Sequence, residues 1–250
     1  MIASLSRGVN CWLDAGLGFF YPEVCQYCGD ERATVGEGYV CSGCWKHVRF
    51  IEPPFCERCG LPYEGDISGR FECSNCAELD LHFSQARSAV AARGMVLELI
   101  HRYKYQRALW LEPFLAGLLV RQAAPHLHPQ DWDMIVPVPL HRLKREEREF
   151  NQAERMAVHL SSATGIPAAH RALARVQPTL TQTRLSRESR AANMQDAFVL
   201  ARPPSLQQKR VILVDDVFTT GATTSACAKV LRAAGAADVS VWTVARGLLR

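Results

Sequence analysis

Hydrophobic and polar residues follow two patterns along most of this chain, one typical of buried strands and the other of amphipathic helices. Short apolar runs predict strands over residues 84–92, 133–139, 209–214 and 238–246. Apolar positions spaced three and four apart predict helices over residues 95–106, 109–124, 149–165 and 221–234. Gly165 and Gly235 close the last two helices, as glycines commonly do. Strands that alternate with helices predict an α/β domain with a mainly parallel sheet.

Residues 171–193 do not share this periodicity. They are basic and rich in threonine, glutamine and serine, which predicts a mobile surface loop. The composition of the whole chain is ordinary for a soluble globular protein, with 48% hydrophobic and 22% charged residues. No apolar run approaches the roughly 18 residues of a transmembrane helix, so we expect no membrane span.

The first 20 residues make a poor signal peptide, because Asn10, Asp14 and three glycines interrupt their apolar stretch. We therefore expect a cytoplasmic protein. Charge is distributed unevenly, although the net charge is only +4. Residues 1–80 carry 6 Lys/Arg and 12 Asp/Glu, whereas residues 81–250 carry 23 and 13. The basic part is the one expected to meet phosphate or nucleic acid, unless its surface is simply solvated.

Eight of the ten cysteines form four C-x2-C pairs in the acidic part of the chain. Zinc takes four tetrahedral thiolates, and each pair supplies two of them from one tight turn. Pairing neighbours in chain order gives two four-thiolate sites, although a cross-braced arrangement stays open. Spacers of 12, 11 and 13 residues separate the pairs, which are Cys25/Cys28, Cys41/Cys44, Cys56/Cys59 and Cys73/Cys76.

Disulfides and redox chemistry are the rival interpretations of these cysteines. Disulfides form in oxidising compartments, and the chain shows no export signal. A single C-x2-C can be redox-active, whereas four in series point to metal. We therefore predict a double zinc ribbon over residues 20–80, with two structural zinc ions, and an α/β domain over residues 81–250.

The segment ILVDDVFTTGATT, residues 212–224, joins a predicted strand to a predicted helix. We expect Asp215 and Asp216 at the carboxyl end of the strand, where the ligands of parallel sheets bind. The hydroxyl residues and Gly221 begin the helix, whose free backbone N–H groups favour an anion. Carboxylates for sugar hydroxyls or hydrated Mg²⁺, set beside a phosphate nest, predict a phosphorylated sugar as the ligand.

Other interpretations of this segment are weaker. A purely structural strand, turn and helix leaves two adjacent carboxylates unexplained. An NTPase strand of this type needs a GxxxxGK[ST] loop elsewhere, and the sequence contains no Gly-Lys pair. A dinucleotide site needs GxGxxG, which is also missing.

The same segment resembles the phosphoribosyl-pyrophosphate (PRPP) motif of type I phosphoribosyltransferases. With the double zinc ribbon, further segments resemble one branch of that fold, the ComF/GntX family, which is associated with competence for DNA uptake or with use of external DNA as a nutrient. These segments are YKY at 103–105, VPVPLHRLKRE at 136–146, FNQAE at 150–154, TLTQTRLSRESRAAN at 179–193 and AF at 197–198.

The resemblance implies a type I phosphoribosyltransferase-like fold, a mainly parallel sheet flanked by helices with a small amino-terminal zinc-ribbon module. It implies that Asp215 and Asp216 hold the ribose hydroxyls, and that residues 179–190 form a mobile loop over the site. The residues expected around the 5-phosphate are Thr219, Thr220, Gly221, Ala222, Thr223 and Thr224. Those expected at the pyrophosphate are Arg142, Lys144 and Arg145.

One position departs from the family pattern. The family usually has glycine before FNQ, and this chain has Glu149. A carboxylate and a Cβ at that point are expected to alter the turn and repel pyrophosphate.

Two functions are compatible with these features. The first is a Mg²⁺-dependent phosphoribosyltransferase that displaces pyrophosphate at C1 of PRPP through an oxocarbenium-like transition state. No catalytic residue can be named, because His101, His141 and His170 each stand alone.

The second is a non-catalytic protein of DNA handling that binds single-stranded DNA and uses PRPP only as a regulatory ligand. Its basic segments, 141–148 and 171–190, would contact phosphates, unless their arginines only surround the pyrophosphate. Tyr103 and Tyr105 would stack on bases, unless Tyr103 is simply a core residue. DNA-uptake proteins are the further partners expected for either function.

Overall fold

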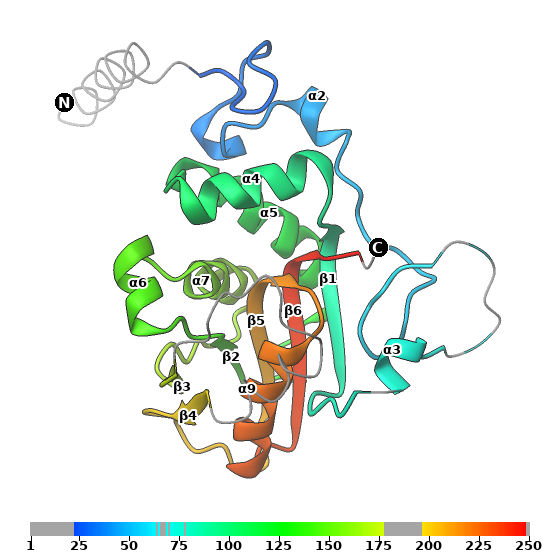
Figure 1. Ribbon diagram of the computed structural model, residues 1–250, viewed down its shortest axis with the longest axis vertical. Coiled ribbons are helices and arrows are strands. Elements are labelled where there is room, and N and C mark those ends of the chain that lie inside the picture. The colour runs from blue at the N-terminus through cyan, green and yellow to red at the C-terminus, as the bar shows by residue number, and fades with distance from the viewer. Residues whose placement is uncertain are drawn as a thin grey trace, which may run out of the picture.

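The computed structural model describes residues 23–63, 65, 69, 71–77, 79–177 and 197–248 (Figure 1). The strands are β1 (Gln85–Ala91), β2 (Met134–Pro137), β3 (Leu173–Arg175), β4 (Phe198–Leu200), β5 (Arg210–Phe218) and β6 (Asp238–Arg246). The α-helices are α2 (Ser42–Trp45), α3 (Ser74–Ala77), α4 (Gly94–Tyr105), α5 (Glu112–Ala123), α6 (Arg142–Arg148), α7 (Gln152–Thr164) and α9 (Ala222–Ala233). Short 3-10 turns are η1 (Val35–Glu37), η2 (Leu109–Leu111) and η3 (Ala124–His126).

The central sheet has the strand order β1-β6-β5-β2, and each neighbouring pair is parallel. Its strands are apolar on both faces, as parallel strands covered on both sides must be. Along β5, Val211 and Leu213 belong to the core on one face, whereas Ile212 and Val214 belong to the core on the other. The predicted fold class, a parallel sheet flanked by helices with an amino-terminal zinc-ribbon module, is confirmed.

The two faces of the sheet are covered by different parts of the chain. Helices α4, α5 and α7 pack on one face together with the first four cysteines of the ribbon. Helix α9, strands β3 and β4 and the last four cysteines pack on the other. Figure 1 shows this separation: the first half of the ribbon lies beside α4, whereas the half that carries α3 lies beside β1. Each half of the ribbon therefore completes a different core.

A buried carboxylate ties α4, α5 and α7 together. Glu112 on α5 is 7% exposed and accepts hydrogen bonds from Arg155 Nε at 2.7 Å and Tyr103 Oη at 3.1 Å, while His159 Nε2 lies 2.8 Å away. Burial by itself would raise the pKa of Glu112, but the bonds to His159 and Arg155 outweigh it and hold the pKa at about 2. Tyr103 is thus a core residue, and the prediction that it stacks on bases is wrong.

Two predicted element boundaries between α6 and β4 need correction. The helix expected from residue 149 begins at Gln152, with Asn151 as its N-cap, because the chain first turns out of α6. The loop expected over 171–193 includes β3, a strand too short to show a period, which pairs antiparallel with β4. Residues 178–196 lie outside the described part.

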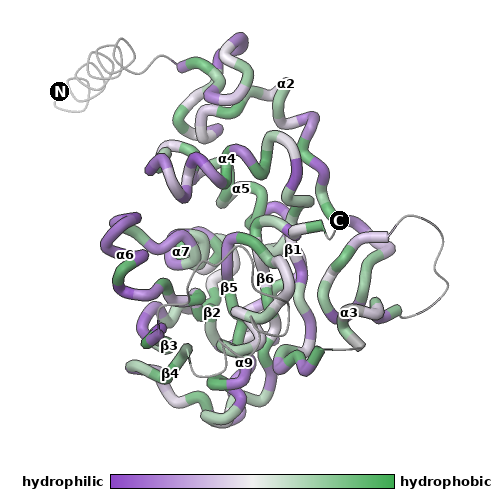
Figure 2. The backbone as a smooth tube through the Cα atoms, viewed as in Figure 1, coloured by the Kyte–Doolittle hydropathy of each residue, from purple (hydrophilic) through white to green (hydrophobic). Residues whose placement is uncertain are grey.

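Strand β5 is longer than the apolar run that predicts it. It continues beyond Val214 as far as Phe218, because β6 stays paired with it to Arg246. Figure 2 shows hydrophobic colours along the central strands and mainly hydrophilic ones along α6, which lies at the edge of the molecule. Among the described helices, none is both long and apolar enough to cross a lipid bilayer.

Candidate functional site

The eight paired cysteines form two compact groups of sulfur atoms. Within each group the sulfurs lie within 4.8 Å of one another, and the closest pairs are 3.6–3.8 Å apart. A zinc ion with Zn–S bonds of about 2.3 Å requires tetrahedron edges of about 3.8 Å, whereas a disulfide is about 2.0 Å long. The groups are Cys25, Cys28, Cys41 and Cys44, and Cys56, Cys59, Cys73 and Cys76.

This grouping fits two structural zinc sites. It follows chain order, so the cross-braced arrangement is wrong. Backbone N–H groups donate to the sulfurs, for example Cys41 N to Cys25 Sγ at 3.4 Å and Cys73 N to Cys56 Sγ at 3.3 Å. Such bonds stabilise thiolates, and four cysteines per ion leave no position open for a substrate.

The two adjacent carboxylates lie inside β5 rather than at its end. Asp215 still pairs with Thr243 of β6, but on the other side β2 has already ended, with Pro137 opposite Val214. Asp215 and Asp216 therefore emerge beside the end of β2, at the carboxyl edge of the sheet where ligands bind. The two carboxylates thus lie at the expected edge of the sheet, but they do so because β2 ends there and not because β5 does.

A pocket of about 130 Å³ opens at this edge. Strand β5, the segment after β2, α6 and the starts of α7 and α9 contribute to its wall, and α4 reaches it from above. The lining residues are Lys104, Val138, Pro139, Leu140, Lys144, Arg148, Asn151, Gln152, Arg175, Asp215, Asp216 and Thr223.

The two carboxylates of this pocket have different electrostatic environments. Lys104 Nζ, at the end of α4, lies 2.8 Å from Asp216 Oδ2, and both side chains are about 15% exposed. Burial, followed by repulsion from Asp216, raises the pKa of Asp215 to about 7. A ligand that brings a cation or hydroxyl donors would relieve this repulsion.

Further cations line the pocket. Lys144 and Arg148 come from α6 and Arg175 from the end of β3. Burial, and then the charges of Arg175 and Arg148, lower the pKa of Lys144. The buried amide Nε2 of Gln152 has no hydrogen-bond partner among the described residues. An anionic ligand would pair these cations and could accept from that amide.

The segment after β5 has the geometry of an anion-binding turn. Gly221 caps α9 with φ +82°, and a Cβ there would stand 2.7 Å from the Phe218 ring, so only glycine fits. Thr223 lines the pocket at the start of α9, where backbone N–H groups point outward. Thr224 is buried, and its hydroxyl donates to the Gly221 carbonyl at 3.1 Å.

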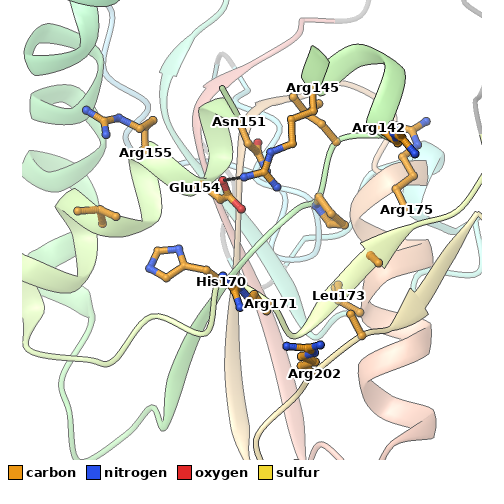
Figure 3. Close-up of a pocket in the computed structure, with 15 residues that line it drawn as sticks. Arg142, Arg145, Asn151, Glu154, Arg155, His170, Arg171, Leu173, Arg175 and Arg202 are labelled. Carbon is orange, nitrogen blue, oxygen red and sulfur yellow. Dashed lines mark hydrogen bonds and ion pairs between the residues drawn. The ribbon is translucent and has the colours of Figure 1, made fainter. Parts of the chain in front are cut away.

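Two of the residues predicted for pyrophosphate lie elsewhere. Arg142 Nε is 2.8 Å from Glu146 Oε1 along α6, and Arg145 Nη2 is 3.2 Å from Glu154 Oε2. Both line a second, larger pocket of about 870 Å³, shown in Figure 3. Lys144, predicted with them, does line the first pocket.

The second pocket is strongly basic. It adjoins the first, since both are lined by Pro139, Leu140, Asn151 and Arg175. Figure 3 shows its arginines arriving from separate elements around one hollow. We call this the arginine pocket; its charged lining is Arg142, Arg145, Arg155, Arg171, Arg175, Arg202 and Glu154.

The structure explains how Glu149 replaces glycine. It ends α6 with φ +67°, the left-handed conformation in which glycine is most at ease. Its carboxylate lies 2.8 Å from Arg107 Nη1 and lines neither pocket. The expectation that this carboxylate repels pyrophosphate therefore finds no support in its placement.

Several lining residues of the first pocket were not predicted as site residues. Lys104 and Gln152 belong to the YKY and FNQ segments, which marked the family without indicating a role. Arg148 and Arg175 stand in basic segments whose spatial relation is invisible in the sequence. The predicted loop over 179–190 lies outside the described residues.

Comparison with known proteins identifies relatives along nearly the whole chain. A double zinc ribbon domain matches residues 16–77. Competence protein F of Haemophilus influenzae is 33% identical over 237 residues, covering 91% of this chain and 98% of that protein. The chain belongs to the ComF/GntX family. DNA utilization protein YhgH of Escherichia coli is 30% identical with the same coverage, and competence protein ComFC of Bacillus subtilis is 27% identical over 83% of this chain and 84% of that protein.

Solved structures resemble this ComF/GntX member more distantly. Glutamine PRPP amidotransferase from Bacillus subtilis is 25% identical over 52% of this chain and 25% of its own, with a TM-score of 0.35. Purine phosphoribosyltransferase from Pyrococcus horikoshii is 18% identical over 53% and 83%, with a TM-score of 0.34. Scores this low carry no argument about ligands.

The sulfur geometry predicts about two zinc ions per chain of this ComF/GntX protein. Metal analysis of the purified protein should find both, and chelation should unfold the amino-terminal module because the zinc sites complete its core. A double variant, Cys56→Ser with Cys59→Ser, should retain about one zinc. A zinc content near zero in the unmodified protein would overturn the assignment.

The raised pKa of Asp215 predicts that the pocket weakens the fold as pH rises. The folded protein holds a proton up to about pH 7, while the unfolded chain releases it near 3.8, so between these values the free energy of unfolding falls with pH. Asp215→Asn should therefore unfold at higher urea than the unmodified protein near pH 8, and the difference should shrink toward about pH 4. Asp131→Asn, a half-exposed control at the other end of the sheet, should show no such gain. An equal response of both variants at every pH would contradict the burial of the Asp215 charge.

Proposed function

We propose that the protein binds Mg²⁺–PRPP, or a related ribose phosphate, in the pocket at the carboxyl edge of its sheet. One observation supports this most directly: the carboxylates Asp215 and Asp216 line one small pocket together with a cluster of cations. A sugar phosphate needs both kinds of group, because its hydroxyls donate to carboxylates and its phosphates pair with cations.

Each part of such a ligand has candidate binding residues in or beside the pocket. The ribose hydroxyls would donate to Asp215 and Asp216, and the 5-phosphate would lie on the turn from Thr219 to Thr224 at the start of α9. The pyrophosphate would lie toward Lys144, Arg148 and Arg175, rather than at Arg142 and Arg145. The buried Gln152 amide would donate to the same ligand.

The residues present also fit a Mg²⁺ ion that arrives with its substrate. Mg²⁺ keeps several waters and takes oxygen ligands from one or two carboxylates and from phosphates. Asp215 and Asp216 supply carboxylate oxygens at the edge of the pocket, without forming an all-protein cage. When bound, Mg²⁺ would neutralise charge on the pyrophosphate.

Phosphoribosyl transfer would rest on positioning and electrostatics in this site. Lys144, Arg148 and Arg175 would stabilise the departing pyrophosphate, while the carboxylates hold the sugar. A screen of nucleobases and amines for PRPP-dependent release of pyrophosphate tests whether turnover occurs.

The relatives connect this site to DNA. Their names, competence protein F and DNA utilization protein, describe uptake and use of external DNA. We therefore propose that ribose-phosphate binding serves the same process here, either through turnover or as a regulatory signal.

Calorimetry tests the proposed site. Asp215→Asn and Asp216→Asn should each weaken Mg²⁺–PRPP binding by about 100-fold or more, because each removes a carboxylate that can accept hydrogen bonds and hold a cation in a poorly hydrated pocket. Asp131→Asn should bind as the unmodified protein does. Unchanged affinity in both pocket variants would show that Asp215 and Asp216 do not form the binding site for Mg²⁺–PRPP.

A second candidate function is supported by the arginine pocket. The basic segments 141–148 and 171–190 were expected to contact DNA phosphates, and the structure brings residues of both into one hollow. Arg202 N donates to the Arg171 carbonyl at 2.8 Å, so the backbone segments that carry these two arginines lie side by side. We propose that single-stranded DNA binds here by its phosphates.

The salt dependence of binding tests this second function. Arg171→Gln with Arg202→Gln should weaken binding and lower the slope of log affinity against log salt by about 1.4, the value for two phosphate contacts on a single strand. Arg32→Gln, an exposed arginine of the first ribbon half, is the control and should leave the slope unchanged. Binding that does not respond to salt would rule out phosphate contacts. Arg184, Arg187 and Arg190, the other arginines expected to bind DNA, lie outside the described residues.

A further inference from the structure

One arginine joins the second four-cysteine group to the turn that begins α9. Arg246 ends β6 and is only 2% exposed, which is rare for arginine. Its Nε donates to the Cys59 carbonyl at 3.2 Å, and its Nη2 lies 3.6 Å from Cys59 Sγ. Its Nη1 donates to the Thr219 carbonyl at 2.6 Å. A single guanidinium thus contacts a zinc ligand and the phosphate-binding turn.

The contact with the turn has a second component. The Arg246 guanidinium lies over the Phe218 ring, 4.6 Å from its centre, and Nη1 also donates to the Phe218 carbonyl at 3.3 Å. The other end of the same ring occupies the space that a Cβ of Gly221 would need. A movement of Arg246 would therefore reach the N-cap of α9 through Phe218.

The buried charge of Arg246 requires a counter-charge. Within the described chain, no carboxylate forms an ion pair with it. Zinc bound by four thiolates carries a net charge of about −2, and Cys59 is one of those ligands. The zinc–thiolate centre is thus the counter-ion that the fold provides for this guanidinium.

We propose that Arg246 couples the second zinc site to the phosphate-binding turn, so that zinc and a ribose phosphate each strengthen the binding of the other. Loss of zinc removes the counter-charge, and the guanidinium then no longer holds the Thr219 and Phe218 carbonyls in place. Coupling between two binding sites is reciprocal, so a ligand that orders the turn also retains the zinc. The proposal rests on the proposed ribose-phosphate site for the identity of its ligand.

The chain offers a matched control for this role. Arg87 contacts the same cysteine knuckle, since its Nη1 donates to the Glu57 carbonyl at 2.8 Å. Its Nη2 lies 3.1 Å from Glu57 Oε2, and the guanidinium packs over the Phe55 ring. Arg87 belongs to β1 and has no bond to the turn before α9. Removing it disturbs the ribbon without cutting the proposed connection.

The test measures zinc release from the full-length, zinc-loaded protein with and without saturating ribose 5-phosphate. Alkylation of the released cysteines and mass spectrometry identify which site loses its metal. In the unmodified protein the sugar phosphate should slow release from the second site by about tenfold, a typical allosteric coupling. Arg246→Met should lose this ratio, and Arg87→Met should keep it. Arg246→Lys should keep part of it, because lysine retains the charge but not the forked donors.

A second readout is independent of the ligand. Hydrogen exchange of the amides from Thr219 to Thr224, in zinc-loaded protein, should be faster in Arg246→Lys than in Arg87→Met. An unchanged release ratio in the Arg246 variants overturns the coupling and leaves the proposed function intact. Failure of ribose 5-phosphate to bind the unmodified protein overturns the proposed function, and the exchange measurement then decides whether Arg246 holds the turn. If Arg246→Met does not fold, Arg246→Lys supplies both measurements.

Discussion

Burial of two neighbouring carboxylates in one small pocket is the constraint around which that pocket is built. Asp215 and Asp216 follow each other in the chain, and they lie at the pocket because β5 continues beside β6 beyond the end of β2. Lys104 balances one of them, and the other is held near neutrality by burial. Lys144, Arg148 and Arg175 line the same pocket, whose buried charges cost folding stability unless a charged ligand pairs with them. Its stability and its affinity for a charged ligand therefore oppose each other.

The zinc ribbon packs into the cores of the α/β domain and is not a separate module. Its two halves pack on opposite faces of the sheet, so each metal site supports a different core. The first half lies against α4, which carries Lys104 into the pocket, and the second contacts the turn before α9 through Arg246. Metal binding, sheet packing and pocket geometry are thus linked through short paths.

Much of this arrangement could be predicted from local pattern. The long strands and helices have clear periods, and the C-x2-C spacing indicates four-thiolate sites directly. Strands β3 and β4 are too short for such a signal. The position of Asp215 inside β5 depends on β2 ending before β6 does. The position of Lys104 at the pocket depends on how α4 packs against the sheet. The division of Arg142, Arg145 and Lys144 between two pockets follows from the turn of α6, which a list of basic residues does not contain.

The contact between Arg246 and Cys59 also has a consequence for synthesis of the protein. The two residues are 187 positions apart, and β6 follows all the other described strands in chain order. During translation the ribbon is made before the sheet and can bind its metal early, but its second half lacks the contact with Arg246 until β6 has left the ribosome. The half-finished chain must therefore carry an exposed apolar surface through most of its elongation, a state that is prone to aggregation.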